Sequence, residues 1–227
     1  MDIKLNQTSK NKLINILIML STFAIALGGV RLYLAGNIKG IFLVWNLFLA
    51  WVPLFIALLM EHKNRKILAI KLLLLIPLWL LFLPNAPYLI TDLIHLRPRD
   101  GVPLWYDASI LFLFAFDGLL VGIVSILLIH EMIAQYLRSF FSWIFLSVCF
   151  ILSGYGIYLG RFLRWNSWDL LVRPVALLEE SFLTVTNPTA MMVTAIFSLI
   201  LFFSYLIFYQ LIHLNQPSYD SKDVEKL

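Results

Sequence analysis

The chain has 227 residues, of which 61% are apolar and 13% are charged, and its formal net charge is +4. Soluble domains carry about 45–50% apolar and about 25% charged residues, so this composition excludes a soluble domain and, equally, a disordered chain. The cations are scattered along the chain rather than gathered on one basic face, which excludes nucleic acid as a partner. The partner that the composition predicts is the lipid bilayer.

Six segments are apolar enough and long enough to cross a membrane as helices. A span needs about 20 mostly apolar residues, and continuous rather than alternating apolarity favours helices over barrel strands. The sequence therefore predicts an all-α polytopic integral membrane protein, with six transmembrane helices and one or two interfacial or re-entrant helices on the outer side. The predicted spans are Leu13–Leu34, Ile41–Met60, Ile67–Leu83, Ser109–Ile129, Phe140–Gly160 and Ala190–Ile212.

The distribution of cations predicts the orientation of these spans. Ten lysines and arginines fall on one side and seven on the other, and the side with more is expected to be cytoplasmic. This places a short N-terminus, residues 1–12, and a disordered tail, residues 215–227, inside, with a single six-helix membrane domain over residues 13–214. Most of the outer cations are arginines, and we expect them to have partners because the planar guanidinium suits paired sites.

The first long outer segment covers residues 84–108. Pro84 ends the third span, Pro87 suits the first turn of a new helix, and Asn85 is a suitable cap for it. We expect this helix to run from about residue 86 to residue 96, either in the membrane interface or folded back into the bundle. One face of it would carry a polar stripe of Tyr88, Asp92, His95 and Arg99.

Asp92 and His95 lie one helical turn apart in this stripe. A carboxylate beside an imidazole can orient it as a general base, supply two metal ligands, or form an ordinary ion pair. Two ligands alone do not make a metal site, and nothing in the sequence fixes the distance to Asp107, the nearest third candidate, which is also a suitable cap for the fourth span. The single cysteine, Cys149, excludes a cysteine-based metal site. The sequence also has no P-loop, dinucleotide fingerprint or paired-histidine zinc motif, so we expect neither a metal nor a cofactor.

The second long outer segment covers residues 161–189. Its candidate ligand-binding residues are Arg161, Arg164, Trp165, Trp168 and Asp169. If the fifth helix continues through them, its arginines and tryptophans share one face that could hold a phosphate or carboxylate against an aromatic wall. Alternatively, Asn166 or Ser167 begins a new helix. Snorkelling arginines and interfacial tryptophans would explain the same residues without a site. Residues 175–185 are typical of an interfacial helix.

Asp117 is the only carboxylate within a predicted span. Such a group costs at least about 2.5 kcal/mol and usually has a partner or a wet cavity. We expect the partner to be Arg161 or Arg164, unless the carboxyl is protonated. The spacings Gly118–Gly122 and Gly156–Gly160 predict close packing of helices, because small residues let backbones approach.

Three strings of the sequence resemble a bacterial family of multi-pass membrane proteins catalogued as domain of unknown function thirteen-sixty-one. They are LPNAPYLITDLIHL at residues 83–96, VPLWYD at residues 102–107 and GIYLGRFLRWNSWDLLVRP at residues 156–174. The resemblance covers roughly residues 39–213. It implies a location in the bacterial cytoplasmic membrane, and it implies no catalytic residue because the family has no assigned activity.

Three functions are compatible with these patterns. The first is an outward-facing polar site that recognises an anionic or polyol head group, such as a lipid phosphate or a lipid-linked sugar, with Asp92 and His95 as the acid/base pair if the protein is an enzyme. The second is a small transporter or channel subunit that uses Asp117. The third is a non-catalytic accessory subunit beside a membrane protein partner. The candidate ligand-binding residues are Tyr88, Arg99, Asp107, Asp117, Arg161, Arg164, Trp165, Trp168 and Asp169.

Overall fold

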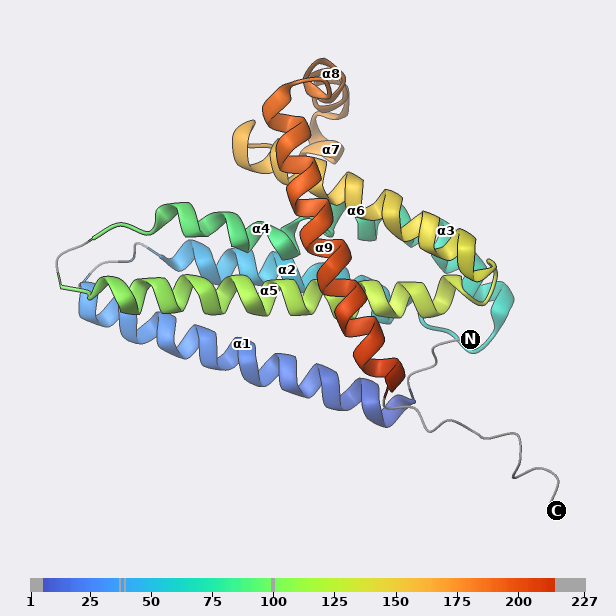
Figure 1. Ribbon diagram of the computed structural model, residues 1–227, viewed down its shortest axis with the longest axis horizontal. Coiled ribbons are helices and arrows are strands. Elements are labelled where there is room, and N and C mark those ends of the chain that lie inside the picture. Colours follow the sequence, from blue (N-terminus) through green and yellow to red (C-terminus); the bar gives the residue numbers. More distant parts are fainter. Residues whose placement is uncertain (1–5, 37, 39, 99–100, 215–227) are drawn as a thin grey trace.

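The computed structural model describes residues 6–36, 38, 40–98 and 101–214. In that part of the chain the regular secondary structure is helical, and six helices are long and apolar enough to cross a membrane (Figure 1). The predicted all-α polytopic membrane fold is confirmed. The elements are α1 (Gln7–Ala35), α2 (Ile41–Met60), α3 (Arg65–Phe82), α4 (Asn85–Thr91), the 3-10 helix η1 (Asp92–His95), α5 (Leu104–Ile133), α6 (Ser139–Phe162), α7 (Asp169–Val172), α8 (Pro174–Thr184) and α9 (Pro188–Leu214).

The helix bounds follow the apolar segments closely. α2 begins and ends where the sequence predicts. α1 begins at Gln7, six residues before the predicted start, because the Asn6 side chain caps it by accepting a hydrogen bond from the Ser9 amide at 2.7 Å. Near the start of α1, Lys10 forms an ion pair with Glu61, which directly follows α2. The predicted tail, residues 215–227, lies outside the described residues.

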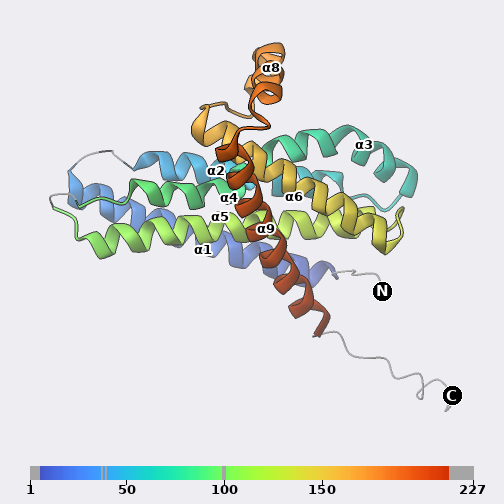
Figure 2. The same ribbon diagram turned by 45° about the horizontal axis from the view of Figure 1, so that its top comes forward.

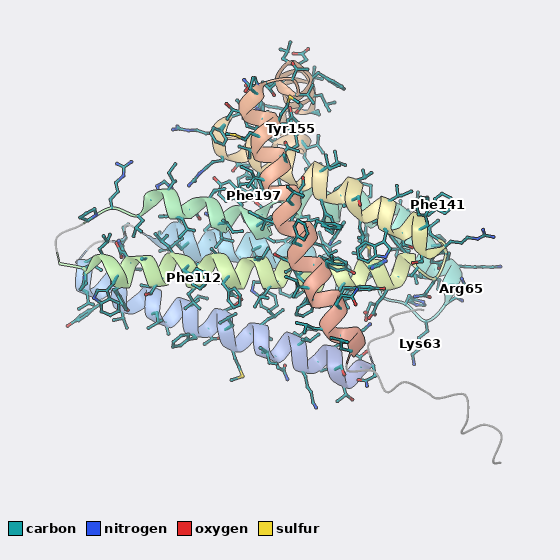
Figure 3. The ribbon with its side chains drawn as sticks, viewed as in Figure 1. Lys63, Arg65, Phe112, Phe141, Tyr155 and Phe197 are labelled. Atoms are coloured by element: carbon teal, nitrogen blue, oxygen red, sulfur yellow. The ribbon has the colours of Figure 1, made fainter. Side chains whose placement is uncertain are left out.

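Apolar side chains cover the lateral surface of the bundle. Phe112 on α5 and Phe141 on α6, for example, are 62% and 55% exposed. Lys63 and Arg65, in contrast, lie together at one end (Figure 3). Large exposed apolar surfaces on a folded chain mark contact with a membrane or a partner. The distribution fits a bundle whose sides face lipid and whose ends face water.

The third span is broken. α3 ends at Phe82, and one tight turn leads into α4 and then into η1, so that Arg65–His95 forms one span of 31 residues. The predicted helix at residues 86–96 is therefore found as an α-helical part and a 3-10 part. The sequence predicted Asn85 as the cap of this helix. In the structure Pro84 holds the cap position and Asn85 is the first residue of α4. The Asn85 side chain instead donates at 2.9 Å to the carbonyl of Phe82, a carbonyl that the end of α3 leaves free.

α4 is folded into the bundle and packs on two glycines of α5. A Cβ atom at Gly118 would lie 2.8 Å from the carbonyl oxygen of Ala86, and one at Gly122 would lie 2.7 Å from the Ala86 Cβ. Both distances are shorter than real Cβ contacts, so the close approach requires glycine at each position. The predicted role of this glycine pair in helix packing is confirmed.

α5 is the central helix, with α1, α2 and α4 beside it (Figures 1 and 2). α6 and α9 pack on each other and cross α5 obliquely, and α7 and α8 connect them (Figure 2). A Cβ atom at Gly154 of α6 would lie 2.6 Å from the Thr194 carbonyl oxygen of α9, and one at Gly156 would lie 2.5 Å from Pro84 Cγ. α6 therefore touches α9 through one glycine and the start of α4 through the next.

Candidate functional site

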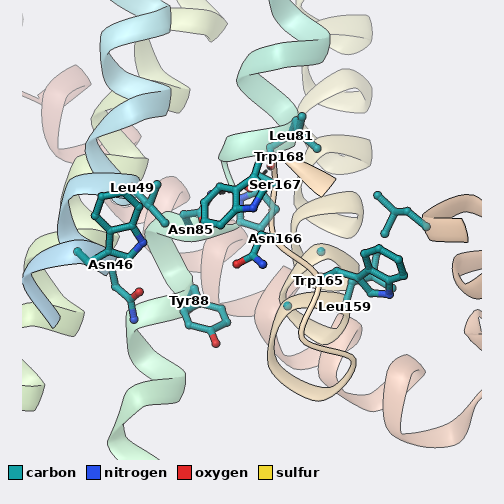
Figure 4. A pocket seen from close by; sticks show the side chains of 15 residues that line it. Asn46, Leu49, Leu81, Asn85, Tyr88, Leu159, Trp165, Asn166, Ser167 and Trp168 are labelled. Carbon is teal, nitrogen blue, oxygen red and sulfur yellow. Dashed lines mark hydrogen bonds between the residues drawn. The ribbon is translucent and has the colours of Figure 1, made fainter. Parts of the chain in front are cut away.

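The two long segments between spans meet at a cavity of about 180 Å³ (Figure 4). Asn85 donates from Nδ2 to Ser167 Oγ at 3.0 Å, and that hydroxyl donates to the Leu81 carbonyl at 3.1 Å, so hydrogen bonds tie α4 to the segment after α6. We call the cavity the amide pocket, after the side chains that line it. Its polar lining is Asn46, Asn85, Asn166 and Ser167, and its aromatic lining is Trp45, Tyr88, Trp165 and Trp168.

The orientation of the three asparagine amides is fixed by their partners. The amide nitrogens donate as follows: Asn46 to Asp92 Oδ2 at 2.9 Å, Asn85 to the Phe82 carbonyl at 2.9 Å, and Asn166 to Asp169 Oδ2 at 3.3 Å. Carboxylates and carbonyls only accept hydrogen bonds, so each amide must turn its nitrogen toward them. Within the described ranges, the structure shows no donor to any of the three amide oxygens, which stay available for a ligand.

Arg161 joins α6 to α4 and η1 beside the amide pocket. Its Nη1 lies 3.3 Å from Asp92 Oδ1 and donates to the Tyr88 hydroxyl at 3.4 Å, and its guanidinium stands 5.4 Å from the centre of the Tyr88 ring. Its Nη2 donates to the Thr91 carbonyl at 2.5 Å and lies 3.3 Å from His95 Nε2. Asp92 is 1% exposed. A nearly buried ion pair therefore holds the tyrosine wall of the pocket in place.

Three of the four residues of the predicted polar stripe on residues 88–99 lie together around Arg161. Tyr88, Asp92 and His95 all reach Arg161, whereas Arg99 lies outside the described residues. The Asp92 carboxylate is bonded to Arg161 and Asn46, and the exposed His95 also meets the Phe42 ring edge-on at 5.4 Å.

Asp107 lies apart from the amide pocket in an ion pair with Arg31 of α1. Arg31 Nε donates to Oδ1 at 2.9 Å and Nη2 to Oδ2 at 3.3 Å, and both side chains are buried. The predicted role of Asp107 as a helix cap is wrong, because α5 begins three residues earlier with Pro103 at the cap position. The pair fastens the end of α1 to the start of α5.

Asp117 also lies apart from the outer arginines. It is fully buried and accepts a hydrogen bond from Ser21 Oγ at 2.6 Å, and Trp51 Nε1 donates to the same hydroxyl at 3.0 Å. The prediction of Arg161 or Arg164 as its partner is wrong, because this face of α5 meets α1 and α2 rather than the end of α6. Its second oxygen, Oδ1, has no hydrogen-bond partner among the described residues.

The chain turns sharply after α6. The helix ends at Phe162, Arg164 is exposed with a φ of 62°, and the Trp165 amide donates to the Leu159 carbonyl at 3.1 Å. The arginines and tryptophans of residues 161–168 therefore do not share one helical face, contrary to the first of the two predictions. The alternative prediction, a new helix that begins at Asn166 or Ser167, is correct in that a new helix, α7, forms. This helix begins at Asp169.

Asp169 holds this turn in shape. Its carboxylate accepts hydrogen bonds from the backbone N–H of Asn166 at 2.8 Å and from Arg173 at 3.3 Å. The bond from the Asn166 backbone, followed by the smaller effect of Arg173, holds the pKa of Asp169 below its ordinary value of 3.8. The ionised carboxylate thus fixes the backbone that carries Asn166 into the pocket.

α8 closes one side of the amide pocket. Trp165 Nε1 donates to Glu180 Oε2 at 2.7 Å, the Arg173 guanidinium stands 4.9 Å from the Trp165 ring centre, and Tyr155 donates to the Ser181 carbonyl at 2.6 Å. The predicted helix at residues 175–185 is found as α8, at Pro174–Thr184. The large apolar side chains of α8 that remain exposed are Val175, Leu178, Phe182 and Leu183.

Three of the outer arginines that the sequence predicts to have partners do form ion pairs. Arg31, Arg161 and Arg173 each meet an aspartate within the part of the chain that the structure describes.

The sequence interpretation missed all four polar residues of the pocket and Trp45. It treated Asn85, Asn166 and Ser167 only as helix caps or helix starts and did not consider Trp45 or Asn46. Asn46 carried a usable signal, since it is the sole carboxamide in the otherwise apolar sequence of α2.

Comparison with known proteins assigns most of the chain to one family. The family model described as "Protein of unknown function (DUF1361)" matches residues 45–203, a range that contains the whole lining of the amide pocket. No curated protein and no solved structure matches the chain. Because the match covers more than half of the chain and agrees with the resemblance of its outer segments, the protein belongs to the family Protein of unknown function (DUF1361).

Proposed function

We propose that this protein binds the polar head group of a membrane lipid or lipid-linked molecule in the amide pocket, at the outer face of a bacterial cytoplasmic membrane. The observation that carries the proposal is the composition of the pocket, in which three amides and four aromatic rings converge from segments far apart in the chain. Ligand sites of helix bundles lie between the helices and combine aromatic walls with a few polar groups. Cation counts support the outer location and the cytoplasmic termini.

The size of the pocket fits a head group rather than a whole lipid. Its 180 Å³ correspond to about six water molecules at about 30 Å³ each, whereas pockets for drug-sized ligands run to about 300–1,000 Å³. Trp45 and Trp168 line the pocket and are 53% and 37% exposed, so its aromatic wall reaches the surface of the bundle. In this proposal, the acyl chains stay in the bilayer while the head group occupies the pocket.

The proposal gives the predicted acid/base pair a positioning role. Asp92 is bonded to both Arg161 and Asn46, which leaves it poorly placed to take a proton from a ligand. Arg161 in turn holds Tyr88 at the pocket wall. These groups therefore support binding, and Arg161 is engaged by the chain itself instead of holding an anion.

Photocrosslinking in intact membranes tests the proposal. The photoreactive residue p-benzoylphenylalanine replaces Trp168 in the pocket or, as the matched control, Trp105, which is 70% exposed outside it. We expect one lipid class to dominate the adducts at position 168 and the bulk membrane mixture at position 105, because only the pocket selects a head group. The same mixture at both positions would contradict the proposal.

Asp117 favours a second candidate function, transport of protons or ions, since its Oδ1 is fully buried without a partner in the described structure. The test is flux into proteoliposomes that contain the parent chain or its Asp117→Asn variant. If Asp117 carries the transported proton or ion, the parent chain should show flux and the variant should not. Equal flux through both proteins would contradict this second function.

A further inference from the structure

The amide pocket offers hydrogen-bond donors and acceptors together. Both N–H groups of Asn85 are used within the chain, so its amide oxygen is what it offers to a ligand. Asn46 and Asn166 each use one N–H within the chain and keep an oxygen and a second N–H. Figure 4 shows Asn46 and Asn166 on opposite sides of the pocket, with Asn85 and Tyr88 between them.

Tyr88 adds a hydroxyl donor. Arginine cannot accept a hydrogen bond, so the contact between Arg161 Nη1 and the Tyr88 hydroxyl uses the oxygen of the tyrosine and not its proton. Within the described residues, the structure shows no acceptor for that proton. The polar lining therefore matches groups that both donate and accept, and hydroxyl groups do both.

The lining of the pocket carries no charge of its own among the described residues. The nearby Arg161 guanidinium is paired with Asp92, and the nearby Asp169 carboxylate is paired with Arg173. A phosphate in the pocket would bring a charge that meets no counter-charge in the lining. As an acceptor only, it would also leave the three amide oxygens without a donor. Burying an uncompensated charge of this kind is costly, so an anionic group is disfavoured.

The aromatic rings supply the apolar part of the site. A sugar ring has C–H faces that pack on Trp45 or Trp168 while its hydroxyls reach the amides at the edge. A quaternary ammonium group would also suit aromatic rings, but it has no N–H or O–H to satisfy the amide oxygens. The three asparagine amides therefore favour a sugar ring over a quaternary ammonium group, because only the sugar can donate hydrogen bonds to their oxygens.

From this lining we infer that the head group is an uncharged, hydroxyl-rich ring, the chemistry of a lipid-linked sugar. The inference rests on the binding function proposed above and narrows its ligand class. It makes Asn46, Asn85 and Asn166 the residues that read the hydroxyls, and Trp45 and Trp168 the residues that stack on the ring.

A lipid-selection experiment tests the ligand class. The full chain is reconstituted in nanodiscs that contain equal amounts of monoglucosyl diacylglycerol, phosphatidic acid, phosphatidylethanolamine and phosphatidylcholine with matched acyl chains. Native mass spectrometry then identifies the lipids that stay bound after the disc is removed. We expect the glucolipid to be enriched over its share, and Trp168→Ala to reduce that enrichment about tenfold, whereas Trp105→Ala leaves it unchanged.

The outcomes separate the inference from the function on which it rests. Selection of phosphatidic acid, phosphatidylethanolamine or phosphatidylcholine that Trp168→Ala abolishes would overturn the sugar class and uphold head-group binding. Selection of no lipid, or selection that responds equally to the changes at Trp168 and Trp105, would overturn both. Trp45→Ala, on another helix, replaces Trp168→Ala if that variant does not fold, and it is expected to lose the same enrichment.

Discussion

At the scale of single residues, two buried aspartates of α5 differ in their partners. Asp107 faces a guanidinium, Arg31, in a bidentate pair, whereas Asp117 accepts a single hydrogen bond from the neutral Ser21. Removing one member of a buried ion pair leaves the other charge uncompensated. Asp117 has no cationic partner among the described residues, so the loss of its charge leaves no such partner behind. The two positions therefore form a matched pair for mutagenesis.

We expect Asp107→Asn to destabilise the protein by about 3 kcal/mol, because the buried Arg31 would lose the counter-charge of Asp107. Asp117→Asn should cost far less, since the amide oxygen still accepts from Ser21. Thermal unfolding of both variants in detergent measures the difference. Equal losses of stability would show that Asp117 has a charged partner that the structure does not reveal.

Asp169 gives the turn beside the amide pocket a defined response to acid. The pKa of this carboxyl is held below its ordinary value of 3.8, so the folded turn favours the ionised form. The stabilisation is complete at neutral pH, persists down to the ordinary value, and is lost as the pH falls through the lowered pKa. Hydrogen exchange at the backbone N–H of Asn166, corrected for its intrinsic pH dependence, should therefore stay slow until the pH falls to the lowered pKa of Asp169. Loss of protection already near neutral pH would contradict this account.

At the scale of elements, the close contact between α4 and α5 depends on glycine. A Cβ atom at Gly118 would lie 2.8 Å from a backbone oxygen of α4, which cannot move aside as a flexible side chain could, whereas one at Gly29 of α1 would meet nothing within 4 Å. The pair gives a test site and a matched control, both in helix interiors.

Gly118→Ala should destabilise the protein by about 1–3 kcal/mol through overpacking and should weaken head-group binding, because α4 carries Asn85 and Tyr88. Gly29→Ala should be neutral or stabilising by up to about 1 kcal/mol, since glycine is the weaker helix former. Thermal unfolding and lipid enrichment measure both effects. If the two variants behave alike, the contact between α4 and α5 is not the one described.

The elements themselves were largely readable from the sequence, and their contacts were not. Continuous apolar runs bounded by charges located the six spans, α2 to the residue. A short apolar helix after two prolines has the same pattern in the interface and inside a bundle, so the position of α4 needed the structure. The partner of Asp117 depends on the rotation of α5 against α1, which no periodicity reveals. For the same reason, Asn46 could not be joined to Asn166 from sequence.

At the scale of the whole molecule, the amide pocket requires both long segments to lie on one side of the membrane. Exposed positions exist on each of them: Arg97 lies after η1 and Val172 ends α7, whereas Lys63 lies between α2 and α3. In a Cys149→Ser background, single cysteines at 97 and 172 should react with an impermeant thiol reagent on intact cells, and a cysteine at 63 should not. Reaction of 97 and 172 from opposite sides would be incompatible with the pocket.

The bundle brings together residues that are distant in the chain. Asn46, Asn85 and Asn166 come from α2, α4 and the turn after α6, and each is anchored through its own amide nitrogen. Such anchoring places the polar groups before a ligand arrives, which lowers the cost of ordering them on binding. The central claim is therefore that the amide pocket is a preformed site for a lipid-linked head group.

A structure determined by electron cryomicroscopy in discs of native membrane lipid tests this claim most directly. It should show density in the amide pocket within hydrogen-bonding distance of the three asparagine amides, with acyl chains that leave past Trp45 and Trp168. A pocket that is closed in the bilayer, or filled by the protein's own side chains, would contradict it.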